Sequence, residues 1–214
     1  SFPFIFIAGY DELNMREAFI RLNKGGTSLS SEDKIFALSY SKDTDFRRHC
    51  AQAVHDLKGG FDNFERKHFL TAVFADLGVK DFISTTSRNN VAKKIKNPRN
   101  PYHIEYKKQH KKIFESIKLS ADFLIQRFKH SSYLPYPAML SILSIFYYYN
   151  NNHHPTEKQI REIERWFWTT GFTKRYSGGN QRYNQLNDAE EMIKLAKSKK
   201  YKINLSAKSR VEPI

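Results

Sequence analysis

The chain has 214 residues, of which 40% are apolar and 14% aromatic, so it can bury a substantial core and wholesale disorder is excluded. Its 36 Lys and Arg against 22 Asp and Glu give a formal net charge of +14, which attracts polyanions such as nucleic acid; a lysine-rich surface that serves only solubility is the alternative. No apolar run approaches the roughly 20 residues of a membrane-spanning helix, and the single cysteine, Cys50, cannot form an internal disulfide, so we expect a cytoplasmic protein without a membrane-crossing helix.

The first 40 residues begin with an apolar run typical of a β-strand, Phe2 to Ala8, which needs strand partners that nothing downstream supplies. A helix is predicted next, ending at the Gly25-Gly26 pair, and Ser30 is placed to cap a second helix. We therefore expect residues 1–40 to be the end of an α/β domain whose sheet lies upstream, and residues 41–214 to form a helical domain.

Apolar residues at helical spacing predict six further helices, so the expected fold is mainly α, a multi-helix bundle with one leftover N-terminal strand. These six helices are expected at residues 45–57, 64–77, 104–129, 136–150, 156–170 and 186–197. The run Asn97-Pro98-Arg99-Asn100-Pro101 is a turn signal, because proline lacks the N–H group that continues a helix. We therefore expect a loop or a broken helix over residues 84–101.

The turn at the paired glycines has the composition of an anion-binding seat. Adjacent glycines allow positive φ, so backbone N–H groups can converge on a phosphate, and the next helix adds its positive N-terminal end. The candidate nucleotide-binding or phosphate-binding residues are Arg21, Asn23, Lys24, Gly25, Gly26 and Thr27. A simple helix C-cap followed by a capped helix explains the same glycines without a ligand.

Two further segments carry candidate nucleic-acid-binding residues. Basic residues cluster between Lys93 and Lys112, while most of the acidic residues lie elsewhere. A glycine-rich loop that follows Trp166 to Trp168 carries cations and hydroxyls that suit a phosphate backbone, whereas an ordinary surface turn is the alternative. The candidates in these segments are Lys107, Lys108, Lys111, Lys112, Lys174, Arg175, Tyr176 and Ser177.

The sequence carries no signature of a common catalytic or metal site. Its eight histidines form no HxxxH or HExxH pair, and neither GxSxG nor a phosphate-binding GxxxxGK[ST] loop occurs. We therefore expect no metal site, assign no catalytic residue, and leave open whether the chain is an enzyme.

In two segments the sequence resembles the GmrSD restriction endonuclease N-terminal domain family, a ParB-like group of bacterial proteins tied to defence against foreign or modified DNA. Phe19 to Ser30 is similar to the family's pattern of phenylalanine, arginine, asparagine, Gly-Gly-Thr and Leu-Ser. Trp166 to Trp168, followed by Phe172 and by Arg175 to Gly178, is similar to the tryptophan and RYSGG-like segment near the end of the family's helical region.

The resemblance implies an intact protein with a nucleotide-hydrolysing DGQQR signature upstream and an HNH nuclease domain or subunit downstream; neither signature occurs in these 214 residues. It also implies that the intact protein uses a nucleoside triphosphate with Mg, in a pocket completed by Arg21, Asn23, Gly25 and Gly26. The fragment itself is then expected to engage DNA, to hold no cofactor and to be inactive alone. The alternative is a non-catalytic basic module that binds nucleic acid or protein. A third possibility is a homo-oligomer or partner interface at Tyr147 to Tyr149, residues that core packing explains at least as well.

Overall fold

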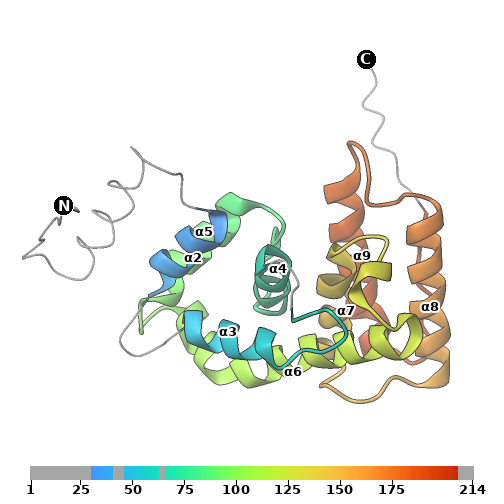
Figure 1. Ribbon diagram of the computed structural model, residues 1–214, viewed down its shortest axis with the longest axis horizontal. Coiled ribbons are helices and arrows are strands. Elements are labelled where there is room, and N and C mark those ends of the chain that lie inside the picture. The colour runs from blue at the N-terminus through green and yellow to red at the C-terminus, as the bar shows by residue number, and fades with distance from the viewer. Residues whose placement is uncertain (1–29, 41–45, 63–65, 207–214) are drawn as a thin grey trace, which may run out of the picture.

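The computed structural model describes residues 30–40, 46–62 and 66–206, and within these ranges the chain forms eight α-helices and one short 3-10 helix but no β-strand (Figure 1). The helices are α2 (Ser31–Ser39), α3 (Phe46–His55), α4 (Arg66–Asp76), α5 (Thr85–Ile95), α6 (Pro101–Phe128), η1 (Ser131–Tyr133), α7 (Ala138–Tyr149), α8 (Glu157–Phe172) and α9 (Gln181–Lys197). The mainly α, multi-helix fold is thereby confirmed. The strand and first helix expected within residues 1–29 lie outside the described residues.

The longest helix of the described residues, α6, runs along the molecule and connects its two ends (Figure 1). Its 28 residues span about 42 Å at 1.5 Å per residue, and Figure 1 shows α2 to α5 at one end of it and α7 to α9 at the other. The helix starts where it does because the Asn100 side chain accepts a hydrogen bond from the backbone N–H of Tyr102, and because Pro101 has no N–H to leave unsatisfied in the first turn.

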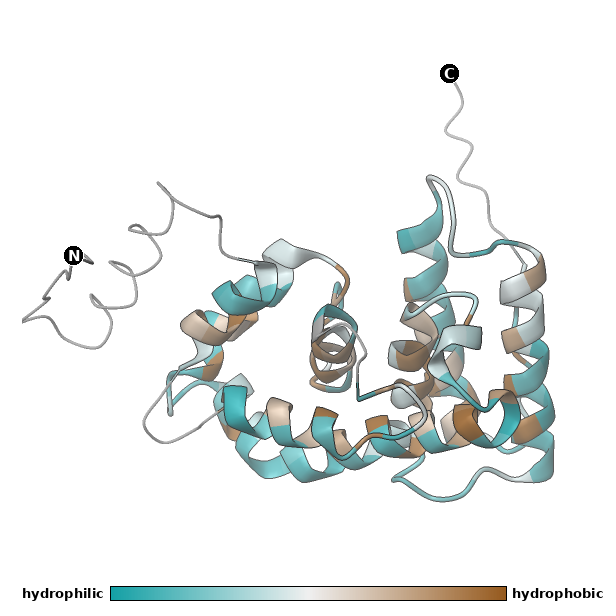
Figure 2. Ribbon diagram, viewed as in Figure 1, coloured by the Kyte–Doolittle hydropathy of each residue, from teal (hydrophilic) through white to brown (hydrophobic). Residues whose placement is uncertain are grey.

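The core is centred on α7, which packs against α4, α6 and α9. Every residue from Met139 to Tyr148 is buried, which accounts for this long, mostly apolar run, and Figure 2 shows apolar residues along the helices that meet in the middle of the molecule. The two serines in this run are satisfied internally: Ser141 Oγ donates to the His68 carbonyl at 3.1 Å, and Ser144 Oγ donates to the Ser141 carbonyl at 2.9 Å. In the described part of the chain, no helix is long and apolar enough to cross a membrane.

The expectation of a loop or broken helix over residues 84–101 was wrong for most of its length, because Thr85–Ile95 is the continuous helix α5. Ser84 caps this helix by accepting from the Ser87 N–H group. The buried face of α5 includes Arg88, whose Nη1 donates to Thr71 Oγ1 at 2.7 Å. Because a charged residue interrupts the apolar stripe, the spacing of apolar residues did not predict this helix. The turn predicted by the two prolines is confined to the short connection before α6.

Helix α2 is built as its sequence predicts. Ser30 Oγ accepts from the Asp33 N–H group at 3.1 Å, and the apolar residues Ile35, Phe36 and Leu38 are buried. The helix packs against α3, α4 and α5, so it shares a core with helices from the expected domain of residues 41–214.

After α9 the chain continues as an extended segment, residues 201–206, held by side chains of α8 and α9. The backbone N–H of Ile203 donates to Glu162 Oε2 at 3.0 Å, and the backbone N–H of Asn204 donates to Glu191 Oε2 at 2.6 Å. Arg165 Nη2 donates to the Ile203 carbonyl, and the Tyr201 hydroxyl donates to Glu191 Oε2. The segment is therefore fixed through its backbone by charged side chains.

Candidate nucleic-acid interface

Half of the formal net charge of the chain lies in one short stretch. Residues 93–118 contain nine Lys and Arg and two Glu, a net charge of +7 out of +14 in 26 of 214 residues. In the structure this stretch is the end of α5, the turn that follows it, and the first two thirds of α6. Because α5 and α6 pack against each other, the charge is concentrated on one part of the surface.

Four lysines of this stretch form what we call the basic face of α6: Lys107, Lys108, Lys111 and Lys118. All four are exposed, and at 100° per residue they fall within about 100° of arc on the helix. None of them makes an ion pair within the described part of the chain, since the ion pairs there involve other residues. Their charges are consequently available to a polyanion.

Lys112, the fourth lysine candidate on α6, has a structural role instead. Its Nζ donates to Asn151 Oδ1 at 2.9 Å and lies 4.4 Å from the centroid of the Tyr148 ring, while its backbone carbonyl accepts from Asn152 Nδ2 at 3.0 Å. The two asparagines both have positive φ, so this lysine fixes a tight connection between α7 and α8 to the side of α6.

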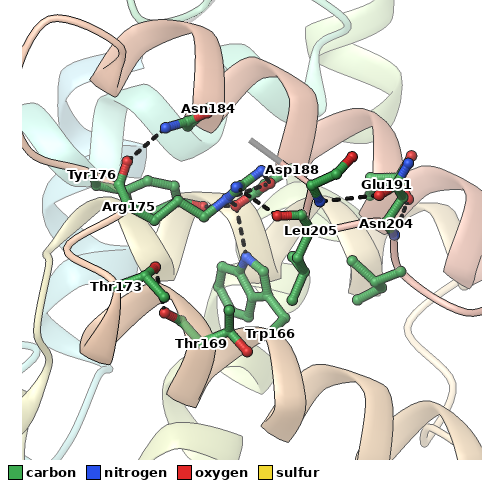
Figure 3. Close-up of polar contacts among 12 residues, drawn as sticks. Trp166, Thr169, Thr173, Arg175, Tyr176, Asn184, Asp188, Glu191, Asn204 and Leu205 are labelled. Atoms are coloured by element: carbon green, nitrogen blue, oxygen red, sulfur yellow. Dashed lines mark hydrogen bonds and ion pairs between the residues drawn. The ribbon is translucent and has the colours of Figure 1, made fainter. Parts of the chain in front are cut away.

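The arginine of the glycine-rich loop is directed into the protein. The Arg175 side chain is 4% exposed and forms an ion pair with Asp188 of α9, which is fully buried (Figure 3). Arg175 Nη2 donates to Asp188 Oδ1 at 2.7 Å, and Nε donates to Oδ2 at 3.0 Å. Such two-point contact is the strongest geometry for an arginine and a carboxylate. The guanidinium therefore stabilises the fold and does not face solvent.

Two aromatic residues complete the surroundings of this carboxylate. Trp166 Nε1 donates to Asp188 Oδ2 at 3.0 Å, and the Tyr176 hydroxyl donates to the same oxygen at 2.8 Å. Burial, and next the negative charge of Asp188, raise the pKa of Tyr176 well above its usual range. Asn184 closes the cluster by donating from Nδ2 to the Arg175 carbonyl. We call Trp166, Arg175, Tyr176, Asn184 and Asp188 the Asp188 cluster.

The other two candidates in this loop lie at the surface. Lys174 is exposed and has positive φ, and Ser177 Oγ donates to the Lys174 carbonyl at 2.6 Å. The structure thus separates the four loop candidates into a buried pair and an exposed pair. The exposed pair lies in the turn between α8 and α9, whereas the basic face lies on α6.

Sequence reasoning missed Asp188, although a signal for it exists. On α9 this carboxylate lies on the same stripe as the buried residues Gln185, Met192 and Leu195. A carboxylate on the inner face of a helix requires a buried cation or several hydrogen-bond donors. Arg182 and Lys194 are nearer to Asp188 in sequence than Arg175 is, so the pattern predicts a buried partner but does not identify which cation it is.

A second buried carboxyl, Asp76 of α4, forms no ion pair within the described part of the chain. The Ser116 hydroxyl donates to its Oδ2 at 2.6 Å, and its Oδ1 has no partner among the described residues. Burial raises the pKa of Asp76 well above its usual range, and the Ser116 hydrogen bond and the positive charge of Lys112 oppose this only in part. The group lies in the core between α4 and α6, near enough to Lys112 for that charge to act on it.

The candidate phosphate seat, with Arg21, Asn23, Lys24, Gly25, Gly26 and Thr27, lies outside the described residues and stays a prediction. Among the described residues no group of three or more His, Cys, Asp or Glu is arranged to hold a metal ion. Comparison of the chain with known protein families, with curated proteins and with solved structures gives no match.

Proposed function

We propose that the helical body binds nucleic acid along the basic face of α6, as part of a bacterial restriction or defence protein of the kind that its resemblance implies. The observation that supports binding is the arc of four exposed lysines that have no ion-pair partner among the described residues, in a stretch that holds half of the net charge. Lysines of this kind neutralise phosphates and release condensed counterions, which drives association without reading sequence. DNA is the expected partner.

The test is the salt dependence of DNA binding, measured by fluorescence anisotropy with a labelled duplex. Replacing Lys107, Lys108, Lys111 and Lys118 together by Gln should weaken binding and flatten the plot of log K against log salt, by about 0.9 for each phosphate that is no longer neutralised. A matched variant changes four other exposed lysines to Gln, namely Lys80, Lys158, Lys199 and Lys200. Equally weakened binding in the two variants would show that only the net charge matters and would overturn the assignment of the face.

The nucleotide seat belongs to the same proposal but is tested separately. In the intact protein, Arg21→Ala and Asn23→Ala should lower nucleoside triphosphate turnover, because a guanidinium fork and a side-chain amide supply donors to phosphate oxygens. Unchanged turnover in both variants would remove these residues from the site. DNA binding by the helical body would be unaffected by that result.

A second candidate function, protein association, is favoured by a pair of exposed aromatic residues on α8. Trp168 is 49% exposed and Phe172 is 81% exposed, and their rings stack with 5.7 Å between centroids and 18° between planes. Exposed aromatic pairs are enriched at protein interfaces. If this pair is an interface, changing both residues to Ser should reduce association measured by sedimentation velocity and leave DNA binding unchanged.

A further inference from the structure

The basic face of α6 borders an open pocket between α3 and α6. The pocket has a volume of about 420 Å³, within the range of roughly 300–1,000 Å³ that is usual for small-ligand sites. Lys111 and Lys118 of the basic face also line it. A polyanion bound to these two lysines would therefore pass directly over the pocket mouth.

The floor of the pocket is aromatic. The imidazole rings of His49 on α3 and His110 on α6 lie parallel, with 9° between planes and 5.1 Å between centroids. Phe114 extends this surface, since its ring meets the His110 ring edge-on at 6.3 Å. Flat rings held in this way offer a π surface on which another flat ring can stack.

The two histidine rings are held in place before any ligand arrives. His49 Nδ1 lies 3.2 Å from the hydroxyl of Tyr106, which is fully buried, and His110 Nδ1 lies 3.0 Å from the Lys107 carbonyl. Preorganised side chains lose little rotamer freedom on binding, so a stacking ligand gains more of the interaction free energy. The pair is therefore suited to bind a planar ring.

Besides the two lysines and the two imidazoles, the polar groups that line the pocket are two carboxylates and one amide. Asp56 and Glu115 line it, and Gln52 donates from Nε2 to Asp56 Oδ1 at 3.0 Å. Carboxylates repel a phosphate but accept hydrogen bonds from the exocyclic amino groups of cytosine, adenine and guanine. The lining thus combines two chemistries, carboxylates that suit a base and lysines that suit the phosphates beside it.

We propose that this pocket receives one unpaired, amino-bearing nucleobase of a strand that lies on the basic face of α6. The inference rests on the proposed nucleic-acid binding and adds the substrate class: single strands, or duplexes with an unpaired base. Stacking on His110 and hydrogen bonds to the carboxylates hold the base, and Lys111 and Lys118 hold the phosphates beside it.

The test uses a single-stranded oligonucleotide that carries the fluorescent adenine analogue 2-aminopurine at one position, and a fully paired duplex of the same length. We expect 2-aminopurine emission to fall when the protein binds the single strand, because stacking quenches it. His110→Ala should abolish the quenching and weaken single-strand binding roughly 5- to 150-fold, the value of one stacked base, while duplex binding stays unchanged. His110→Phe should retain both.

A second variant, Ala53→Phe, fills the pocket from α3 without touching a lysine, and should also abolish quenching. His154→Ala, in an exposed loop, is the matched control and should behave as the original protein. Adenosine monophosphate, which offers the base with one phosphate, should compete only weakly. Competition as strong as that of the strand would identify a mononucleotide pocket and overturn the inference.

The outcomes separate the inference from the function on which it rests. No binding to either oligonucleotide would overturn both. The base pocket alone would be overturned if the basic-face variant weakens binding but 2-aminopurine is not quenched. The same conclusion would follow if the original protein and His110→Ala change the emission equally.

Discussion

Arg175 and Asp188 form a buried, two-point ion pair that joins three separate parts of the chain. The guanidinium reaches the carboxylate of α9 through Nε and Nη2, and its Nη1 donates to the Leu205 carbonyl at 3.0 Å. Trp166 of α8 bonds to the same carboxylate (Figure 3). The turn after α8, the middle of α9 and the extended segment beyond it therefore depend on one charge pair.

Asp188→Asn should lower the free energy of unfolding by about 3–5 kcal/mol, because it leaves the Arg175 charge buried without a counter-charge. Urea denaturation followed by circular dichroism measures this change. Glu157→Gln is the matched control, since it breaks an exposed ion pair with Arg161 and should leave the urea midpoint unchanged. A similar midpoint for both variants would show that the Asp188 cluster is not a determinant of stability.

The protein should lose stability as the pH rises above the ordinary aspartic acid pKa of about 3.9, through the contribution of Asp76. The pKa of Asp76 is raised in the folded state, so between the unfolded and folded pKa values the folded state binds more protons. The slope from this group reaches at most about 1.4 kcal/mol per pH unit.

Asp76→Asn provides the test of that slope, because its side chain has the same shape and never ionises. The variant should match the original protein near pH 4 and be the more stable of the two near neutral pH, measured by urea denaturation across the pH range. Glu190→Gln removes an exposed carboxylate and should show no such divergence. Parallel stability curves for the original protein and Asp76→Asn would contradict a raised pKa.

The Cys50 thiol should be protected from reagents in the folded protein. It is 3% exposed, and burial raises the pKa of the thiol, so both access and thiolate formation are suppressed. Reaction with Ellman's reagent, followed by absorbance, should be slow in buffer and complete within mixing time in denaturant. Because this is the only cysteine of the chain, the signal reports on the burial of α3 alone. Rapid labelling in buffer would be inconsistent with the packing of α3.

Gly59→Ala should destabilise the protein more than Gly78→Ala. Both glycines have positive φ, which costs an alanine about 1–2 kcal/mol. A Cβ at Gly59 would lie 2.5 Å from Ile125 Cγ1, whereas a Cβ at Gly78 would meet no atom within 4 Å. The overpacking at Gly59 should add about 1–3 kcal/mol. Thermal unfolding of the two variants measures the difference, and equal destabilisation would mean that Ile125 moves aside freely.

Helices with a regular apolar stripe could be predicted from the sequence. The expected helices at residues 104–129, 136–150 and 156–170 agree with α6, α7 and α8 to within three residues. The helix α5 was missed because its inner face carries Arg88, whose Nη1 bonds to the Lys67 carbonyl and to Thr71 Oγ1 on α4, partners that only the folded chain brings near. Likewise α9 begins five residues before its expected start, because its first turns are polar.

The candidate site could be predicted only in part, because the sequence shows where charged residues cluster but not whether their side chains point into the protein or toward solvent. The exposed lysines of α6 follow from helical spacing, whereas the inward course of Arg175 depends on Asp188, thirteen residues later. The ring pair of His49 and His110 could not be foreseen at all. These residues are 61 positions apart, and only the packing of α3 on α6 places them together.

The extended segment after α9 has a practical consequence for shortening this protein. Cutting the chain before Tyr201 would remove hydrogen-bond partners from Glu162, Glu191, Arg165 and Arg175 at once. These charged side chains would then lose the backbone groups that they now bond to. A trimmed version intended for binding measurements should therefore keep Leu205.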